Sequence, residues 1–334
     1  MSAALDWEVR PGHPALTRAP GTAGLDEACQ WLKEAEPELR SALLEHGAVF
    51  VRGLPVASSE DVALVRDILI PRRTPYREKA TPRSDFGNGV FSSTDLPPAQ
   101  AIRMHNENSY TLTFPGLLLF ACLVAPAEGG ATPVADCRKV LRDLPPGLVR
   151  RMRTAGWTLT RNYTGLVSLD WPTAFGTENR DEVAAYCADN HIGWRWLPDG
   201  TLRTRQLRPG IITHPRAGAE VWFNHVAFWS EWSLDTDIRA ALIEEFGPDG
   251  LPFSTGFGDE APLAEPDVAA LNAAYAAATV REAWQPGDVM LVDNLLSAHG
   301  RDPFRGDRKI AVAMGEPVGL LDCQPGVAPA AVAC

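Results

Sequence analysis

The sequence lacks several features that would assign it to particular classes of protein. Its six cysteines are scattered without a C-x-x-C pair, which argues against a disulfide framework or a cysteine-based zinc site and favours a reducing cytoplasm. The longest apolar run, residues 117–127, is far shorter than the ~20 residues that a membrane-spanning helix needs. The opening stretch MSAALDWEVR has neither the basic part nor the apolar part of a secretory signal.

Positive charge is also scarce, because 31 Lys and Arg stand against 42 Asp and Glu, giving a net charge of −11. Such a surface repels nucleic-acid phosphates and anionic lipids, so we expect neither nucleic acid nor membrane as a partner. Hydrophobic residues nevertheless make up 45% of the chain and charged residues 22%. That composition is typical of a globular protein and excludes a disordered, collagen-like or coiled-coil chain.

The distribution of Pro, Gly and small residues along the sequence predicts one folded domain with a short segment at each end. We expect an irregular N-terminal lead-in over residues 1–24, where Pro, Gly and small residues gather, and a C-terminal tail over residues 319–334. The single domain between them covers residues 25–318. Apolar spacing predicts that this domain opens with two helices, separated at Pro37 and ending at Gly47.

Short strands dominate the rest of the chain. A third early helix is expected over residues 59–70, with Ser58 and Asp61 as a capping pair, and others near residues 181–189, 236–246 and 267–279. The predicted strands span residues 48–54, 102–112, 117–125, 157–163, 201–207, 210–214, 220–224, 288–294 and 308–314. This pattern favours a mainly β fold with helical insertions, a jelly-roll barrel. An alternating βαβ sheet is the less favoured alternative, because no Gly-rich nucleotide loop follows any predicted strand.

Three residues form a candidate metal site. On a regular strand, His105 and Glu107 lie on one face, so an imidazole and a carboxylate converge inside the barrel. His299, after a late strand, would add a third ligand, and two histidines with one carboxylate suit Fe(II) with open positions for a chelating cosubstrate and O₂. The alternatives are a polar stretch on an exposed strand, a satisfied core histidine and a loop histidine bonded to the backbone.

Two further residues are candidate anchors for the cosubstrate. A cosubstrate with a distal carboxylate needs a buried bidentate donor, and the guanidinium of Arg308 suits that role. Thr132, in the stretch EGGATPVAD, is a candidate hydroxyl donor to the same carboxylate. A surface ion pair for Arg308 and a turn-stabilising hydroxyl for Thr132 are the structural alternatives.

Several segments together resemble one known family. RMHNENSY, PAEGGATPVADCRKVL, RNY, THPRAGAEVWFN and GDVMLVDNLLSAHGRDPFRGDRKIAVAM occur in this order and resemble the TauD/TfdA family of Fe(II)/2-oxoglutarate-dependent oxygenases. The wording H-N-E-x-S-Y, G-G-x-T-P and H-G-R-x-P-F is similar to the SyrP-like branch of that family. The resemblance runs over roughly residues 47–317.

The resemblance implies a double-stranded β-helix that encloses iron. It implies that His105, Glu107 and His299 bind Fe(II), and that Arg308 and Thr132 hold the far carboxylate of 2-oxoglutarate. Related halogenases lack the carboxylate ligand, so the presence of Glu107 implies hydroxylation or another oxygenase outcome.

The implied substrate is an amino acid or an amino-acid-derived molecule, free or tethered to a carrier protein, in natural-product biosynthesis. Desaturation, epoxidation or cyclisation would use the same metal ligands and are the alternative reaction outcomes. The alternative functions are a non-catalytic cupin-like binding protein and a zinc hydrolase. His225 either tunes the substrate or supports the site. The candidate substrate-binding residues, each with a structural hydrogen bond or surface charge as the alternative, are Arg161, Asn162, Asn224, His225 and Arg301.

Overall fold

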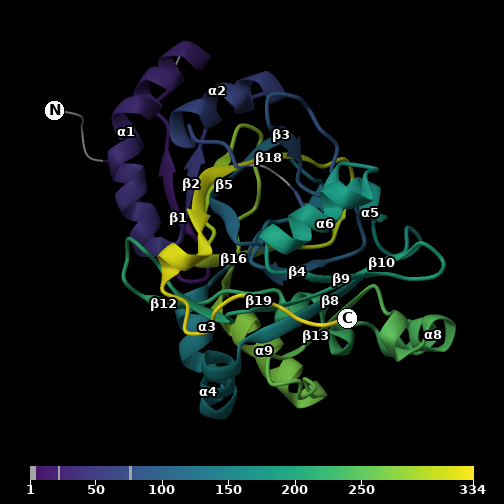
Figure 1. The fold of residues 1–334 in the computed structure, drawn as a ribbon. Helices are drawn as coiled ribbons and strands as arrows, with labels where there is room; N and C mark the ends of the chain where they lie inside the picture. The colour runs from purple at the N-terminus through teal and green to yellow at the C-terminus, as the bar shows by residue number, and fades with distance from the viewer. Residues whose placement is uncertain (1–4, 22, 75–76) are drawn as a thin grey trace.

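The computed structural model describes residues 5–21, 23–74 and 77–334. Strands of several sheets fill the centre, and helices cover the outside (Figure 1). The prediction of a mainly β jelly-roll fold with helical insertions is confirmed. The helices, in chain order, are α1 (Leu25–His46), α2 (Ser59–Leu69), α3 (Cys137–Asp143), α4 (Pro146–Ala155), α5 (Trp171–Phe175), α6 (Arg180–Asp189), α7 (Val226–Trp229), α8 (Thr236–Phe246) and α9 (Glu265–Ala278).

The largest sheet has six strands. Their order across the sheet is β1 (Ala15–Arg18), β2 (Ala48–Arg52), β15 (Val289–Asp293), β5 (Thr113–Val124), β18 (Lys309–Gly319) and β3 (Val90–Ser92). On its central strand β5, Leu119 and Ala121 pack toward α1 and α2, whereas Leu118 and Phe120 pack toward the interior. Because both faces of this sheet are covered, β5 is apolar along most of its length and does not alternate.

A smaller sheet faces the interior side of the large one. Its order is β14 (Thr279–Val280), β7 (Val134–Asp136), β16 (Ser297–Arg301) and β4 (Ile102–His105). Val134 of β7 belongs to the same buried cluster as Leu118 and Phe120 of β5. The ring of Phe120 also lies 5.3 Å from the ring of His299 in β16. The polar residues discussed below therefore lie between two sheets, where packing keeps them from bulk water.

The remaining strands form a third sheet and two separate pairs. A third sheet has the order β13 (Phe253–Phe257), β8 (Trp157–Tyr163), β10 (Leu202–Arg208) and β19 (Ala330–Ala331), and β9 (Gly193–Trp196) also pairs with β10. The two pairs are β11 (Ile211–Thr213) with β12 (Glu220–Trp222) and β6 (Glu128–Gly129) with β17 (Phe304–Arg305). Short 3-10 turns lie at Glu231–Ser233, Pro248–Gly250 and Leu320–Cys323.

The prediction of two helices separated at Pro37 is wrong, because α1 runs unbroken from Leu25 to His46. Pro37 lies on the exposed side of this helix, where water can bond the carbonyl that loses its helical donor. The buried stripe that includes Leu32, Leu39 and Leu43 continues past it. Packing of this stripe outweighs the local cost of the proline.

The two terminal segments contain more structure than the sequence predicted. Of the lead-in 1–24, residues 1–4 and 22 lie outside the described residues, but Ala15–Arg18 form a buried strand that pairs in parallel with Ala48–Arg52. In the tail, Ala330 and Ala331 pair with β10. The capping pair of the helix Ser59–Leu69 is confirmed, since Ser58 and Asp61 form a reciprocal capping box.

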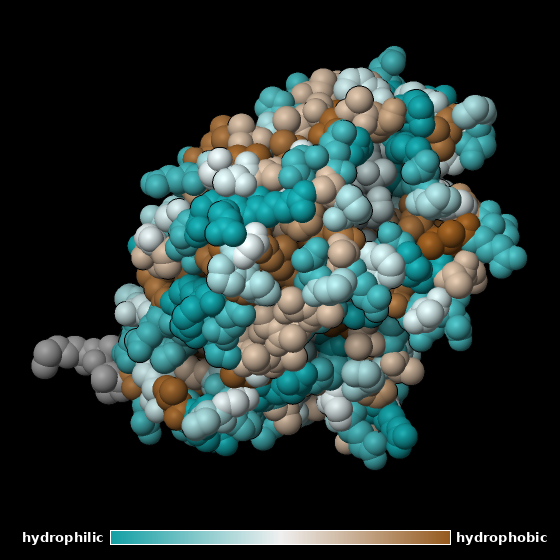
Figure 2. Space-filling view, turned by 90° about the horizontal axis from the view of Figure 1, so that it is seen from below, coloured by the Kyte–Doolittle hydropathy of each residue, from teal (hydrophilic) through white to brown (hydrophobic). Residues whose placement is uncertain are grey.

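Within the described ranges, each helix is too short or too polar to span a bilayer. On the face seen from below, hydrophilic and hydrophobic residues are interspersed, and the apolar ones form small separate patches (Figure 2).

Candidate metal and cosubstrate site

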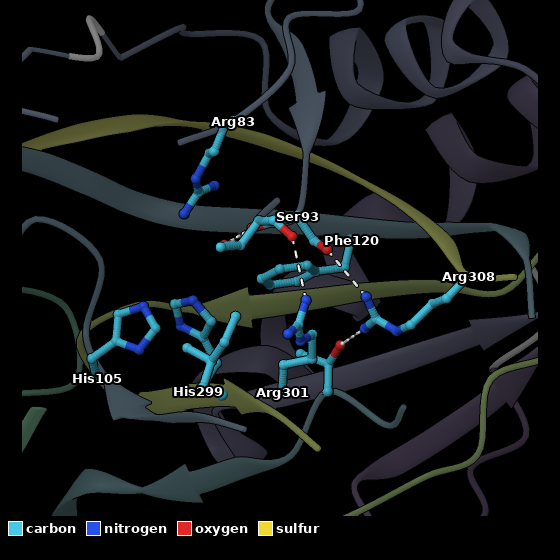
Figure 3. Close-up of a pocket in the computed structure, with 11 residues that line it drawn as sticks. Arg83, Ser93, His105, Phe120, His299, Arg301 and Arg308 are labelled. Atoms are coloured by element: carbon cyan, nitrogen blue, oxygen red, sulfur yellow. Dashed lines mark hydrogen bonds between the residues drawn. The ribbon is translucent and has the colours of Figure 1, made fainter. Parts of the chain in front are cut away.

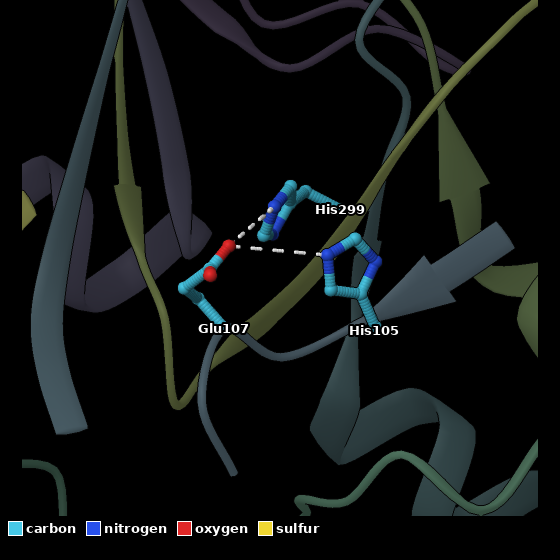
Figure 4. A group of neighbouring side chains, drawn as sticks. All are labelled: His105, Glu107 and His299. Carbon is cyan, nitrogen blue, oxygen red and sulfur yellow. Dashed lines mark ion pairs between the residues drawn. The ribbon is translucent and has the colours of Figure 1, made fainter. Parts of the chain in front are cut away.

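Three side chains from separate segments converge between the two sheets. His105 ends β4, His299 lies in the middle of β16, and the two residues are direct partners across the antiparallel pair. Their Nε2 atoms lie 4.0 Å and 3.8 Å from Oε2 of Glu107 (Figure 4). The three ligand atoms lie within 4.8 Å of one another, and each residue is at most 8% exposed. This is a compact, buried set of two imidazoles and one carboxylate.

Glu107 reaches this site by a different route from the one the sequence predicted. The predicted strand 102–112 ends at His105, and Glu107 lies in the turn that follows, so strand alternation does not aim its side chain. Instead, Asn294 fixes the backbone of the turn. Its side chain accepts a hydrogen bond from the Glu107 N–H at 2.7 Å and donates to the Glu107 carbonyl at 2.9 Å. Asn294 also donates to the Pro115 carbonyl at 2.7 Å, which ties the turn to β5.

Replacing Asn294 with Ala is expected to lower both stability and metal affinity. The change leaves buried backbone groups of Glu107 and Pro115 without their partner, at a cost of about 3 kcal/mol in the free energy of unfolding. We also expect divalent-metal affinity to fall about 10- to 100-fold, as for other residues that orient a ligand. Chemical denaturation and metal titration measure the two effects, with Asn272→Ala in α9 as the control. Wild-type metal affinity in a destabilised Asn294→Ala variant would contradict this role.

The two histidines have the protonation state that a metal requires. Burial lowers the pKa of His105, and it holds the pKa of His299 well below its usual range, so both imidazoles are neutral at pH 7. Nδ1 of His105 donates to the Arg103 carbonyl at 2.9 Å, which leaves Nε2 with its lone pair facing Glu107. The Nδ1 atom of His299 has no hydrogen-bond partner among the described residues, so a loop histidine bonded to the backbone is not what is observed. This donor set fits Fe(II).

Aromatic rings surround the histidines. Phe228 of α7 lies 4.7 Å from the ring of His105, and Phe120 lies 5.3 Å from the ring of His299. The ring of His225 lies 5.3 Å from the ring of His105 and stacks on Trp229. Nδ1 of His225 also forms a 2.6 Å hydrogen bond with the Ser109 hydroxyl. Burial also holds the pKa of His225 well below its usual range, so this third imidazole is neutral. The side of the candidate ligands formed by these rings is therefore apolar or uncharged.

A small cavity opens beside the histidines, and both predicted cosubstrate anchors, Arg308 and Thr132, line it (Figure 3). The guanidinium of Arg308 donates to the Gly130 carbonyl, the Ser93 hydroxyl and the Thr132 hydroxyl at 2.9–3.2 Å. The Thr132 oxygen also accepts from the indole N–H of Trp284, so its own proton is free to be donated. Within the described part of the chain, no carboxylate forms an ion pair with Arg308. A half-buried cation of this kind attracts an anionic ligand.

The Gly-Gly turn before Thr132 makes room for Arg308. Gly130 has φ of +66°, and a Cβ built there would lie 3.1 Å from Cδ of Arg308 and 2.9 Å from Cβ of Phe304. A larger residue would therefore be strained and would displace the guanidinium. Burial lowers the pKa of Arg308 to about 10, so the side chain is still charged at neutral pH.

Arg301 lines the same cavity, but its contacts are with the protein backbone. Its two terminal nitrogens donate to four carbonyls of the segment 94–100, at distances between 2.8 Å and 3.3 Å. Arg301 thus holds the segment 94–100, part of which lines the cavity, in place. Its substrate role stays a prediction, and the structure favours the structural alternative.

Most of the other predicted substrate residues form hydrogen bonds to backbone carbonyls of the protein. Arg161 is 2% exposed, packs against aromatic rings that include Tyr163, and donates to two backbone carbonyls. Asn162, on the opposite side of β8, donates to the carbonyls of residues 249 and 251. Asn224 donates to the Gly210 carbonyl. Of these predicted residues, only His225 lies directly against a candidate metal ligand, and a substrate role for all four stays a prediction.

Sequence reasoning missed Arg83. Its Nη2 atom donates to Oε2 of Glu107 at 2.7 Å, and its side chain lines the cavity together with Arg301 and Arg308. Arg83 lies in an irregular segment before β3, where no apolar period or motif marks it. The basic stretch around it in the sequence carries no signal that separates it from surface arginines.

Comparison with known proteins gives consistent matches. The family described as "Taurine catabolism dioxygenase TauD, TfdA family" matches residues 8–314. The dapdiamide synthesis protein DdaC of Enterobacter agglomerans is 36% identical over 318 residues, covering 93% of this chain and 95% of that protein. A clavaminate synthase-like protein of Arabidopsis thaliana is 29% identical over 326 residues, covering 92% and 94%.

A solved structure shares the fold. PvcB, described as an Fe, alpha-ketoglutarate dependent oxygenase from an isonitrile synthetic pathway, has a TM-score of 0.52 and 16% identity, covering 94% of this chain and 93% of that one. The similarity at this identity concerns the fold. The assignment to the SyrP-like branch stays a prediction.

Proposed function

The chain belongs to the TauD/TfdA family and is an Fe(II)/2-oxoglutarate-dependent dioxygenase, and we propose that it hydroxylates an aliphatic C–H bond of an amino acid or amino-acid-derived substrate. In this proposal His105, Glu107 and His299 bind the iron, while Arg308 and Thr132 hold the far carboxylate of 2-oxoglutarate. The observation that carries the proposal is the convergence of two neutral imidazoles and one carboxylate, all buried, within 4.8 Å.

In this proposal, different side chains present the metal ligands, exclude water and orient the cosubstrate. When bound, iron and 2-oxoglutarate activate O₂ and supply the oxidant, with succinate and CO₂ as co-products. His105, held by its Nδ1 hydrogen bond to the Arg103 carbonyl, presents Nε2 in a fixed direction. Phe120 and Phe228 exclude water from the histidines. Arg308 and the Thr132 hydroxyl orient the cosubstrate from the far end of the cavity.

Glu107 supports an oxygenase outcome. Halogenases related to this family lack the carboxylate ligand, whereas here a buried carboxylate faces both histidines at 3.8–4.0 Å. Desaturation, epoxidation and cyclisation use the same ligands and are the alternative outcomes. Since the chain is a dioxygenase, a non-catalytic binding role and zinc hydrolysis are no longer needed to explain the site.

The proposed substrate class rests on different support. The most similar of the relatives described above carries a name that refers to dapdiamide synthesis, which supports a role in a natural-product pathway. Small molecules, rather than nucleic acids or lipids, are the partners we propose, with carrier-tethered presentation as a second possibility. We propose a cytoplasmic location on the basis of the six scattered cysteines.

A substrate panel tests this function. Purified enzyme with Fe(II), 2-oxoglutarate and O₂ is incubated with free amino acids, their amides and carrier-bound thioesters, and products are followed by mass spectrometry. We expect one member to gain one oxygen atom with one succinate released per product. A product that instead loses two hydrogens would favour desaturation, and failure of the whole panel to couple substrate oxidation to succinate would contradict the proposed substrate class.

A further inference from the structure

One buried cation touches the carboxylate on which the proposed metal site depends. The Nη2 atom of Arg83 lies 2.7 Å from Oε2 of Glu107, and both side chains are less than 8% exposed. Oε2 is also the oxygen that faces His105 and His299 (Figure 4). A guanidinium and the two proposed imidazole ligands therefore converge on a single oxygen atom.

The structure fixes Arg83 in this place. The next residue, Ser84, is paired with Ser92 of β3 through two hydrogen bonds, one from its N–H to the Ser92 hydroxyl and one from the Ser92 N–H to its carbonyl. Because β3 is the edge strand of the large sheet, this pairing ties the segment before it to β18. From there the side chain of Arg83 reaches into the cavity toward the histidines (Figure 3).

Oε2 of Glu107 lies within bonding distance of Arg83 but not of the two imidazoles. Oε2 is 3.8 Å and 4.0 Å from the two Nε2 atoms, beyond hydrogen-bond distance of either, while its distance to Nη2 of Arg83 is that of a strong charge-assisted hydrogen bond. A metal ion bound by this oxygen atom and both histidines would compete with the guanidinium for the same lone pairs and would weaken the bond of Oε2 to Arg83.

We propose that Arg83 is a positioning residue that acts as the resident counter-ion of Glu107 and competes with the divalent metal ion for its Oε2 atom. This inference rests on the proposed metal site. Arg83 keeps a buried carboxylate paired, since an unpaired buried charge is strongly destabilising. The same positive charge lies a few ångströms from the metal position, where it repels a divalent cation. Both effects weaken metal binding in the wild-type protein.

The two effects predict an unusual result for Arg83→Gln. Removing the guanidinium destabilises the metal-free protein and also removes the repulsion, so metal affinity should rise while stability falls. A residue that merely held the fold together would give the opposite sign for affinity, because a loosened site binds metal less well. The direction of the change in affinity therefore separates the two roles.

The experiment is a calorimetric titration of chelator-treated protein with Co(II), with thermal unfolding measured before and after loading. We expect Arg83→Gln to bind Co(II) at least about tenfold more tightly than the wild type, to melt at a lower temperature without metal, and to gain more from loading. Arg83→Lys, which keeps the charge, should return the affinity toward the wild-type value. Arg72→Gln removes the same charge from an exposed pair with Glu316 and should leave affinity unchanged.

The outcomes separate this inference from the proposed function. Equal or weaker Co(II) binding by Arg83→Gln, in a wild type that binds Co(II), would overturn the counter-ion role alone. Absence of Co(II) binding by the wild type would overturn the proposed metal site, and the inference with it. If Arg83→Gln does not fold, Co(II) binding by the milder Arg83→Lys variant is the test. The shorter side chain of lysine weakens the bond to Oε2 while the charge remains, so Co(II) should bind slightly more tightly than in the wild type. Unchanged or weaker binding would overturn the inference.

Discussion

Replacing Glu107 with Gln is expected to abolish both tight Fe(II) binding and substrate oxidation. The amide keeps the shape of the side chain but removes the only negative charge among the three proposed ligands. Loss of a residue that merely orients a ligand costs about 10- to 100-fold in metal affinity, so loss of the charged ligand itself should cost more than about 100-fold. Anaerobic titration with Fe(II) and 2-oxoglutarate measures this effect through the weak visible charge-transfer band of the complex. His299→Ala is expected to lose the same band.

Two controls make this result interpretable. Glu128→Gln removes an exposed carboxylate of β6 and should leave the band and the activity intact. The melting temperature of Glu107→Gln shows whether the protein still folds with Arg83 facing an amide. A folded Glu107→Gln variant that hydroxylates its substrate at the wild-type rate would contradict the proposed ligand set.

Replacing Arg308 with Gln is expected to raise the KM for 2-oxoglutarate about 100-fold. The side chain is a half-buried cation whose three hydrogen bonds all go to uncharged oxygens, so the far carboxylate of 2-oxoglutarate would be its charged partner. Truncating one member of a buried charged pair costs about 2–5 kcal/mol, and each 1.4 kcal/mol is a factor of ten. Steady-state succinate formation at varied 2-oxoglutarate gives this KM.

Neighbouring residues serve as graded controls. Thr132→Val removes one hydroxyl donor and should raise the KM about tenfold, as expected for a hydrogen bond to a charged group. Lys309→Gln removes a positive charge from the next, exposed residue and should have little effect. If the KM is unchanged in Arg308→Gln, the anchor is another cation of the cavity, and Arg301→Gln is the variant to measure next.

The sequence predicted which residues meet, but not how they are brought together. Residue spacing was expected to aim His105 and Glu107 from one regular strand, yet the strand ends at His105 and the turn that places Glu107 depends on Asn294. The pairing of His105 with His299 across β4 and β16 joins positions far apart in the chain. Such register is set by tertiary packing, which a local pattern does not contain.

Cations were the hardest residues to interpret from sequence. Arg301 and Arg161 were predicted as substrate contacts, but their donors are engaged by backbone carbonyls, a role that depends on where loops pass in space. Arg83, which touches Glu107, lies in an irregular segment without a motif. Long apolar patterns were more informative, since most predicted strands match observed ones, and Pro37 misled only because its exposed position within α1 was not visible.

Anomalous diffraction from anaerobic crystals loaded with Fe(II) and 2-oxoglutarate shows directly whether His105, Glu107 and His299 bind iron. We expect one strong iron peak between the two sheets, about 2.0–2.3 Å from Nε2 of His105, Nε2 of His299 and a carboxylate oxygen of Glu107. An iron peak at another place in the protein, or one that leaves any of these three side chains out of contact, would contradict this expectation.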